Sequence, residues 1–302
     1  MAEHLSQSEL DYPFKLLEYF NGFRVSKVIF SACELGVFDL LTTSPCALSA
    51  QQVAQSLHAS VDGTERLLDA LVGIKILHVE LQDGTALYSS TDVASVYLAK
   101  SGAKSLHDMA LYQSQTIYPL WNNLADAVRE GKNQNRKTFG IPPEEVFQAI
   151  YRSEEEMLKF MGLMDSSWVL DGHDVVTAFC LDGFRNIVDF GGDFFHGELP
   201  AADLYVLARI LHDWSEDKCL TLLKRIYDIC KPGGGVLLVE AMLLESRRGP
   251  IQAQLFSLNM LVQAEGRERP PSEYTGMLRR SGFRDVQLCR TGKSYDAILA
   301  RR

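Results

Sequence analysis

The stretch NIVDFGGDFFHGELPAADLYVLARILHDW, residues 186–214, decides the fold of this chain. Residues 187–188 are typical of a buried strand, and Asp189 with the Gly191-Gly192 pair is typical of the sharp turn that follows a strand in nucleotide-binding folds. A helix is expected next, yet the chain runs through residues 193–195 to a second apolar strand predicted over residues 204–210. A complete strand-helix-strand unit needs about 30 residues, so this connection is too short.

Beyond this stretch, strand and helix patterns alternate. We expect a helix capped by residues 215–217 and ended by Lys-Pro-Gly-Gly at 231–234, and a strand over 235–240. A helix over 251–263 and an antiparallel pair of strands over 283–288 and 295–300 follow. This order predicts an α/β fold, the second half of a doubly wound sheet whose first crossover units are missing.

The N-terminal third has a different pattern. Apolar residues recur at helical spacing from residue 14 to residue 41, which predicts one or two buried helices. Helical patterns over 50–57 and 62–71, an alternating stretch over 74–81 and the turn at 82–84 predict a winged helix-turn-helix. Residues 46–79 carry only two basic side chains, Arg66 and Lys75, against three acidic ones, so DNA binding is disfavoured.

Residues 105–185 are predicted to be helical. One helix is expected over 121–128, ending near Gly131, and another is expected to begin at residues 142–145. Ser153 and Glu156 fit a capping box. The apolar stripe that follows favours either core packing or a flexible wall for a flat aromatic ligand; its members are Met157, Leu158, Phe160, Met161 and Met164.

Length and composition exclude several classes of protein. A chain of 302 residues with 46% apolar and 23% charged residues predicts a globular protein of two domains. A net charge of -9 disfavours general binding to nucleic acid or to anionic membranes, because both need dense Lys and Arg contacts with phosphate. A small neutral or cationic ligand is a better match for this charge.

The cysteines and the N-terminus indicate a cytoplasmic protein. The six cysteines are scattered, without a C-x-x-C pair or a zinc-type cluster, and are expected to be reduced thiols. The first residues lack the pattern of a signal peptide, and no apolar run approaches the about 20 residues of a membrane span.

Several segments together resemble the class I S-adenosylmethionine-dependent O-methyltransferases. They are His-Asp-Trp at 212–214 after a strand, K-P-G-G-G and V-E-A further on, and also NGFRVSKVIFSACELGVFDLL, AIYRSE, SLNMLVQAEGRERP and YDAILAR. The resemblance implies a winged-helix-like dimerisation domain over residues 1–104 and a Rossmann-like catalytic domain over 105–302. It also implies a homodimer, S-adenosylmethionine as the methyl donor and a small hydroxyindole as the acceptor.

This chain departs from the family at one point. In the family, the glycine turn continues into a longer loop, a helix, a strand ending in an acid, a further helix and a further strand. Here both flanking motifs are intact and are joined at about residues 191–192, which indicates a clean internal deletion such as exon skipping produces. The strand ending at Asp189 is then expected to become a sheet edge, and cofactor binding is expected to be impaired. The alternative is a catalytically inactive short form that dimerises with the full-length enzyme.

The chemistry of methyl transfer to a hydroxyindole needs a base, and His212 follows the strand end where open α/β sheets place their ligands. Glu240, at the end of the next strand, is predicted to orient the imidazole. Its alternative is an ordinary solvated strand end. Glu268 matches a second acid of the family; alternatively, it pairs with the neighbouring Arg267 and Arg269. His212, Glu240 and Glu268 are thus the candidate catalytic residues.

The resemblance also implies binding residues. Asp213, Asn259 and Gln263 match substrate-contacting positions, and the two amides lie four residues apart on one helix face, where they could recognise an acetamide group or form a plain polar stripe. The positions that match cofactor contacts are Tyr151, Trp168, Gly192, Asp193, Phe194 and Arg209. Tyr151 and Trp168 have core packing as an alternative. No metal is expected, on the ground that no cluster of carboxylates stands beside the base.

Overall fold

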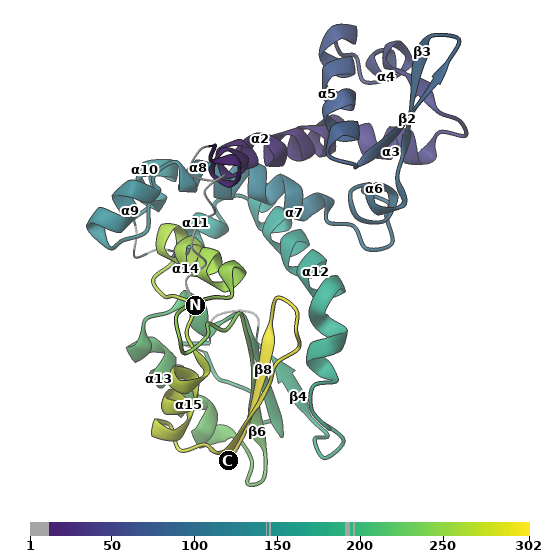
Figure 1. The fold of residues 1–302 in the computed structure, drawn as a ribbon. Helices are drawn as coiled ribbons and strands as arrows, with labels where there is room; N and C mark the ends of the chain where they lie inside the picture. Colours follow the sequence, from purple (N-terminus) through teal and green to yellow (C-terminus); the bar gives the residue numbers. More distant parts are fainter. Residues whose placement is uncertain (1–11, 143, 145, 191–193, 196) are drawn as a thin grey trace. The chain divides into compact units, whose positions relative to one another are not determined.

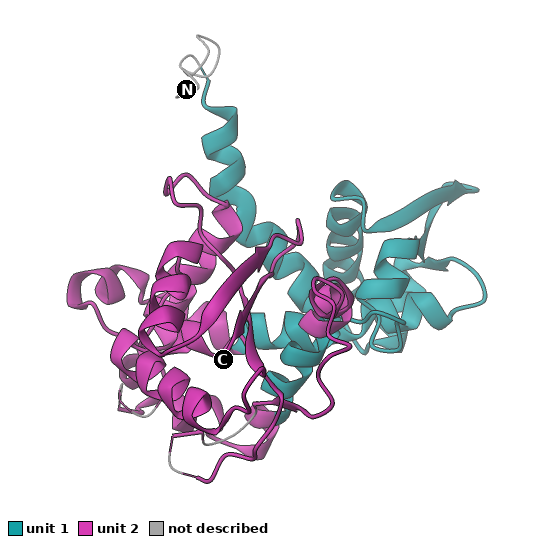
Figure 2. Ribbon diagram, turned by 90° about the horizontal axis from the view of Figure 1, so that it is seen from below, with its two compact units in different colours: residues 1–115, 158–166 teal, residues 116–157, 167–302 magenta. Residues whose placement is uncertain are grey.

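The computed structural model describes residues 12–142, 144, 146–190, 194–195 and 197–302. The chain forms two compact units (Figure 2). Unit 1 comprises Met1–Gln115 and Leu158–Ser166, and unit 2 comprises Thr116–Met157 and Ser167–Arg302. The boundary lies near residue 115, about ten residues beyond the predicted one at 104, and unit 1 also includes part of a later helix.

Unit 1 contains the predicted helix-turn-helix and hairpin. Ser49 begins α4 with a capping box that includes Gln52, and Ser60 caps α5. Asp83 and Gly84 both have positive φ, which is the geometry of a tight turn between two antiparallel strands. The elements of this unit are α2 (Phe14–Leu35), α3 (Val37–Thr43), β1 (Leu48–Ser49), α4 (Ala50–Ser56), α5 (Val61–Gly73), β2 (Leu77–Gln82), β3 (Thr85–Ser90), α6 (Asp92–Tyr97) and α7 (His107–Tyr112).

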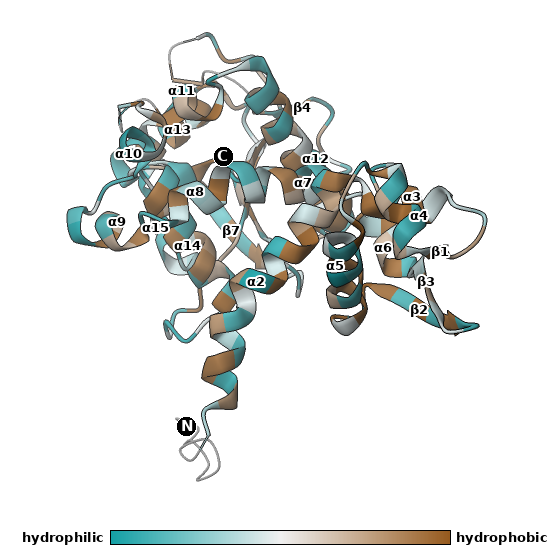
Figure 3. Cartoon of the chain, turned by 90° about the horizontal axis from the view of Figure 1, so that it is seen from above, coloured by the Kyte–Doolittle hydropathy of each residue, from teal (hydrophilic) through white to brown (hydrophobic). Residues whose placement is uncertain are grey.

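Helix α2 differs from the expectation. Only Ala32 and Cys33 of its 22 residues are buried, so the prediction that this whole region is buried is wrong for most of α2. Large apolar side chains of its N-terminal half are exposed, and hydrophobic segments recur along it (Figure 3). We define the α2 apolar surface as the exposed side chains of Phe14, Leu16, Leu17, Tyr19, Phe20, Phe23 and Val25.

The helices before the sheet are short, apart from the last. The helix predicted over 121–128 is interrupted at Asn122 and Asn123. Ser153 caps the long helix by accepting the Glu156 N–H, which is half of the predicted capping box, while the Glu156 carboxylate accepts from Arg152 and Thr116. Pro143 and Glu145 lie outside the described residues. These elements are a π-helical turn (Gln113–Ile117), α8 (Tyr118–Trp121), α9 (Leu124–Glu130), α10 (Asn135–Phe139), α11 (Val146–Ile150) and α12 (Glu154–Val176).

The apolar stripe of α12 is not a buried core. Leu158 and Met161 are exposed, and Met157, Phe160 and Met164 are half-buried. Among the described residues, no helix of the chain is long and apolar enough to cross a membrane. All six cysteines are free thiols, as expected.

Unit 2 has the predicted α/β sheet, with strand order β4-β5-β6-β8-β7 (Figure 1). The first three strands are parallel, and β8 pairs antiparallel with both β6 and β7. All six residues of β6 are buried. The elements are β4 (Ile187–Asp189), β5 (Leu204–Ala208), α13 (Glu216–Ile229), β6 (Gly235–Glu240), α14 (Ile251–Gln263), α15 (Pro271–Arg280), β7 (Arg284–Cys289) and β8 (Asp296–Arg301).

Strand β4 lies at the edge of this sheet, which confirms the expectation. Its Ile187 side chain is 50% exposed. The described residues between Phe190 and Leu204 contain no helix. Apolar strand surface that a crossover helix and a neighbouring strand would cover therefore faces solvent.

Aromatic rings pack the short connection after β4 into the core. The Phe190 ring stacks on Tyr205 at 5.6 Å, and the Phe195 ring meets Trp214 edge-on at 4.9 Å. Arg225 of α13 donates to the Phe194 carbonyl at 2.5 Å and to the Gly197 carbonyl at 2.6 Å. These contacts satisfy backbone oxygens of an irregular segment, which has no ladder to pair them.

Strand β5 is shorter than predicted because the backbone turns at Arg209. The strand ends at Ala208, and Arg209 adopts φ +57° while its N–H still donates to the Val239 carbonyl. A 3-10 turn follows over Leu211–Asp213. This reversal places His212 on a turn beyond the carboxyl end of the strand.

Candidate active site

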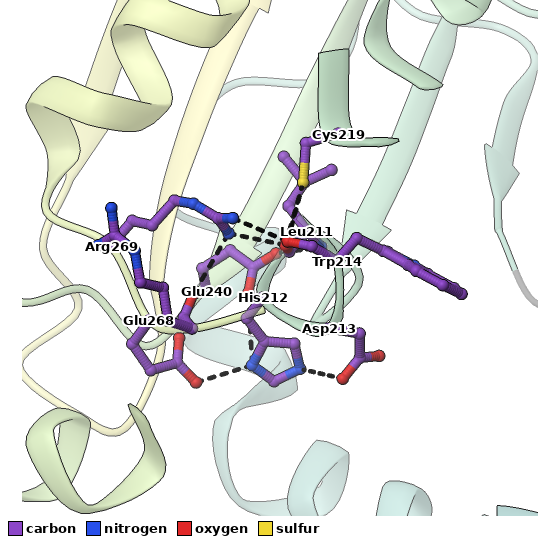
Figure 4. Close-up of polar contacts among 9 residues, drawn as sticks. Leu211, His212, Asp213, Trp214, Cys219, Glu240, Glu268 and Arg269 are labelled. Atoms are coloured by element: carbon purple, nitrogen blue, oxygen red, sulfur yellow. Dashed lines mark hydrogen bonds and ion pairs between the residues drawn. The ribbon is translucent and has the colours of Figure 1, made fainter. Parts of the chain in front are cut away.

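The imidazole of His212 lies among three carboxylates (Figure 4). Its Nδ1 is 2.7 Å from Glu268 Oε1 and 3.8 Å from Glu240 Oε2, and its Nε2 is 3.6 Å from Asp213 Oδ1. Glu240 and Glu268 are fully buried, and His212 is largely buried. Four titratable groups from three separate segments of the sequence thus share one buried site.

The 3-10 turn that carries His212 is held from several sides. Glu240 Oε1 accepts the Leu211 N–H at 2.8 Å, and the Cys219 thiol donates to the Leu211 carbonyl at 3.2 Å. The Arg269 guanidinium donates to the carbonyls of Leu211 and Trp214, each at 2.8 Å. Because both ends of the turn are fixed by buried groups, the imidazole has a defined position relative to the strand ends.

Glu268, and not Glu240, makes the short contact with the imidazole. The alternative in which Arg267 and Arg269 pair with Glu268 is wrong, because Arg267 donates to Glu273 at 2.6 Å and Arg269 donates to the two carbonyls of the turn. Glu240 is not a solvated strand end either, since it holds the turn by binding a backbone N–H. The orienting contact predicted for Glu240 is thus made by Glu268.

A close backbone approach brings Glu268 to this place. Gly266 lies against the turn so tightly that a Cβ atom there would be 2.2 Å from the His212 carbonyl oxygen. The N–H of Glu265 also donates to the Asp213 carbonyl at 3.1 Å. Only glycine fits at position 266, and this fit fixes the path of the chain toward Glu268.

The surroundings of the site raise the pKa of three of its titratable groups and so favour their protonated forms. Burial lowers the pKa of His212, but the charges of Glu268, Asp213 and Glu240 outweigh burial and raise its pKa to about 10. Burial raises the pKa of Glu240 to about 8 and that of Asp213 to about 6. The imidazole therefore holds both protons near neutral pH, and its Nδ1–H donates to Glu268.

The reason given for excluding a metal is wrong, because carboxylates do stand beside the base. Ligand atoms of His212, Glu240 and Glu268 lie within 4.8 Å of one another, close enough to hold a cation. In the described part of the chain, Glu240 Oε2 and Glu268 Oε2 have no hydrogen-bond partner. The protonated imidazole supplies one positive charge to this cluster of three carboxyl groups.

Helix α14 carries the two amides predicted to contact the acceptor. Asn259 and Gln263 share a face with Phe256, whose ring stacks on Tyr295 at 6.3 Å. Arg209 also contacts this ring, with its guanidinium carbon 5.3 Å from the centre of the Tyr295 ring. This face of α14 thus packs toward the strand ends that carry the site.

The C-terminus of α14 is capped by side chains and backbone that the sequence analysis missed. The carbonyls of Val262, Gln263 and Ala264 accept from Gln134 N–H, Asn135 Nδ2 and Asn133 Nδ2 at 2.9, 3.0 and 3.3 Å. These three polar residues are buried. Carbonyls that a helix end leaves without partners are thereby satisfied.

Among the cofactor candidates, Arg209 lies close to the site, and the aromatic residues Tyr151 and Trp168 are partly exposed. Tyr151 is 40% exposed and Trp168 is 41% exposed, so their alternative as core aromatics is wrong. Tyr151 lines an open hollow of about 410 Å³ with Phe147, Gln148 and Arg152. Burial, and then the negative charge of Asp213, raise the pKa of Tyr151.

The other three cofactor candidates belong to the short connection after β4. Phe194 is only 4% exposed, and its ring meets Trp214 edge-on at 6.3 Å within the core. Gly192 and Asp193 lie outside the described residues.

Comparisons with known proteins agree on one family. An O-methyltransferase dimerisation domain profile matches residues 17–100, and an O-methyltransferase domain profile matches residues 121–193 and 190–284. Acetylserotonin O-methyltransferase of Gallus gallus is 46% identical over 344 positions, covering 98% of this chain and 99% of that protein. The Homo sapiens protein of the same name is 46% identical over 343 positions, covering 98% and 99%.

A solved structure gives the same result. The crystal structure of human N-acetylserotonin methyltransferase in complex with SAM superimposes with a TM-score of 0.94 at 45% identity, and the match covers 100% of this chain and 99% of that chain. The alignment with the Gallus gallus protein runs over 344 positions against the 302 residues here, and the catalytic-domain profile is split at residues 190–193. The relatives therefore contain residues that this chain lacks.

Proposed function

The chain belongs to the O-methyltransferase family, and on this premise we propose that it is an S-adenosylmethionine-dependent O-methyltransferase that methylates the 5-hydroxyl of N-acetylserotonin to give melatonin. The observation that carries the acceptor chemistry is the 2.7 Å contact between His212 Nδ1 and Glu268. It fixes one ring nitrogen as a donor and leaves Nε2 as the atom that exchanges a proton.

His212 acts as the base in this proposal. The 5-hydroxyl is phenol-like, with a pKa of about 10, so it keeps its proton at neutral pH unless a base removes it. S-adenosylmethionine supplies the methyl group when bound. In the fraction of the protein whose Nε2 carries no proton, a fraction that grows as pH rises toward the pKa of His212, Nε2 takes the hydroxyl proton. The negative charge of Glu268 stabilises the imidazolium that results. The pKa of His212 is raised to about 10, close to the pKa of the 5-hydroxyl, so proton transfer from the hydroxyl to the imidazole is close to equilibrium.

We assign the acceptor contacts to Asp213, Asn259 and Gln263. Asp213 lies beside Nε2 of the imidazole, where the hydroxyl group is expected. Asn259 and Gln263 project from one face of α14, and the acetamide group offers them a carbonyl and an N–H to bind.

The described residues supply only part of a methyl-donor site. We assign Tyr151, Trp168 and Arg209 to the donor side, and the first two are partly exposed. The helix whose N-terminal N–H groups would meet the anionic end of the cofactor is absent among the described residues after β4, and so is the strand whose acid would hold the ribose. We therefore propose that an internal deletion at about residues 191–192 impairs cofactor binding.

The proposed reaction is tested by radiolabelled methyl transfer. A version of the chain carrying the residues that the Gallus gallus relative has at the junction is assayed beside the chain itself. We expect the restored chain to label N-acetylserotonin and to leave N-acetyltryptamine, which lacks the 5-hydroxyl, unlabelled. Label on N-acetyltryptamine, or none on either compound, would contradict the assignment of acceptor and site.

The α2 apolar surface favours a second function, that of a short form that pairs with the full-length enzyme. Tyr19 is 66% exposed and Phe20 is 62% exposed, and both lie in the segment that matches the dimerisation domain. Such a surface is suited to a second copy of the same domain, because exposed apolar patches of this kind mark protein interfaces. We propose that this chain forms homodimers and also pairs with a full-length partner.

Co-expression tests this pairing. The chain is produced together with a tagged, segment-restored version and is expected to co-purify with it, while the double substitution Phe20→Asp and Phe23→Asp is expected to abolish co-purification. His78→Gln, an exposed change on the hairpin, serves as the control that should still co-purify. Recovery of the tagged version alone, without the short chain, would rule out the second function.

A further inference from the structure

A hydrogen bond in unit 2 fixes the orientation of one of the acceptor amides. The indole Nε1 of Trp121, the last residue of α8, donates to Asn259 Oδ1 on α14 at 2.8 Å. An indole nitrogen can only donate, so the atom of Asn259 that faces it must be the oxygen. The assignment of the amide oxygen and nitrogen, often ambiguous in structures, is here set by chemistry.

The nitrogen of the same amide is left for another partner. Within the described residues, no hydrogen bond to Asn259 Nδ2 is formed, and this atom is not among the polar atoms sealed from solvent. The amide nitrogen therefore keeps some contact with solvent. An accessible donor pair held in place by a second residue is suited to bind an acceptor atom of a ligand.

The amide lies on the face of α14 that packs toward the catalytic groups. Phe256, one turn earlier on this face, stacks on Tyr295, and the charge of Glu268 is felt at Tyr295 together with that of Arg209. The segment after α14 binds the His212 turn through the N–H of Glu265. The helix that carries Asn259 is thus held by a ring contact in its middle, and the segment that follows it binds the turn that carries His212.

We propose that Trp121 is a positioning residue for acceptor specificity. By holding Asn259 Oδ1, it turns the amide NH2 toward the acceptor, so the site takes an indole whose side chain ends in a carbonyl oxygen. The same indole with a free ammonium group presents only donors and meets two N–H donors of Asn259, which leaves both groups unsatisfied. The inference rests on the proposed function for the identity of the acceptor.

Calorimetric binding of N-acetylserotonin and of serotonin to the chain as it is tests this role without methyl donor. Trp121→Phe keeps the ring and removes the N–H; it is expected to weaken N-acetylserotonin binding about tenfold and to leave serotonin binding unchanged. Asn259→Asp, which presents an acceptor oxygen, is expected to reverse the preference toward serotonin. Asn122→Ala, an exposed neighbour of Trp121, is the matched control and should keep the original preference.

A second readout tests the contact itself. The chain has three tryptophans, so its indole N–H signals in a ¹H–¹⁵N spectrum are few enough to assign. Asn259→Leu is expected to shift the Trp121 indole signal. An unmoved signal, or a Trp121→Phe variant with undiminished preference for N-acetylserotonin, overturns the proposal. If the unchanged chain binds neither ligand, the proposed acceptor is wrong, and so is the proposed role of Trp121 in acceptor specificity. The indole signal still decides the orientation of Asn259.

Discussion

Restoring the missing segment after the glycine turn is expected to raise the affinity for S-adenosylmethionine at least 100-fold. The segment brings a helix N-terminus to the anionic end of the ligand and an acid to the ribose hydroxyls. Hydrogen bonds to charged groups contribute about 1.5–3 kcal/mol each, so two of them account for about 3–6 kcal/mol, which is at least about two powers of ten. Isothermal titration calorimetry of the two chains measures the difference.

The control for this experiment is an insertion of the same length rich in Gly and Ser. It restores the spacing of the chain but brings neither a helix N-terminus nor an acid, and it is expected to bind the cofactor no better than the present chain. Micromolar affinity of the present chain for S-adenosylmethionine would contradict the prediction and would show that Tyr151, Trp168 and Arg209 suffice on the donor side.

The same segment has a structural consequence that is visible in the sheet. In the relatives' longer sequences, further residues follow the glycine turn, whereas here β4 is the edge strand and Ile187 is half exposed. Phe190 and Phe194 pack inward, and Arg225 binds the carbonyls of the short connection. The deletion therefore leaves a connection with buried rings and satisfied carbonyls. It also exposes the edge of the sheet and removes part of the methyl-donor site.

The elements with strong local signals could be predicted from the sequence. The predicted strand over 235–240 and the predicted helix over 251–263 have the observed bounds, because glycines mark the start of the first, Pro250 precedes the second, and continuous apolar residues or helical periodicity follow. The end of β5 could not be predicted, since apolar residues continue past Ala208 while the backbone reverses at Arg209 through a positive φ. Apolar periodicity carries no information on such a reversal.

The candidate site was predictable residue by residue but not in its contacts. His212, Glu240 and Glu268 were all identified, yet which acid touches the imidazole depends on the close approach of Gly266, which is a tertiary feature. Trp121 contacts Asn259 across 138 positions of sequence, and no local pattern indicates such a pair. The burial expected for α2 was wrong for a related reason, because an apolar pattern does not reveal what covers it.

His212→Gln in the segment-restored chain is expected to lower kcat for N-acetylserotonin by 10²- to 10⁴-fold, the range that a general base typically contributes. Glutamine keeps a polar group on the turn but cannot take a proton from the hydroxyl. The dissociation constant for S-adenosylmethionine should stay within about twofold, because the substitution leaves the donor side unchanged. A stopped assay with labelled donor, combined with calorimetry, separates the two quantities.

The pH dependence of the same chain tests the role of Glu268. The carboxylates raise the pKa of His212 to about 10, so the fraction of imidazole able to accept a proton, and with it kcat/KM, should increase as pH rises from 7 toward that value. Glu268→Gln removes one negative charge, so it should lower the pKa of His212 and move this rise to lower pH, even where it reduces the maximal rate. His173→Gln near the end of α12 should leave the profile unchanged. Two results would contradict this assignment. A profile that is flat above pH 7 in the unsubstituted chain would mean that His212 is not the base, and a profile that Glu268→Gln does not move would mean that Glu268 does not raise the pKa of the base.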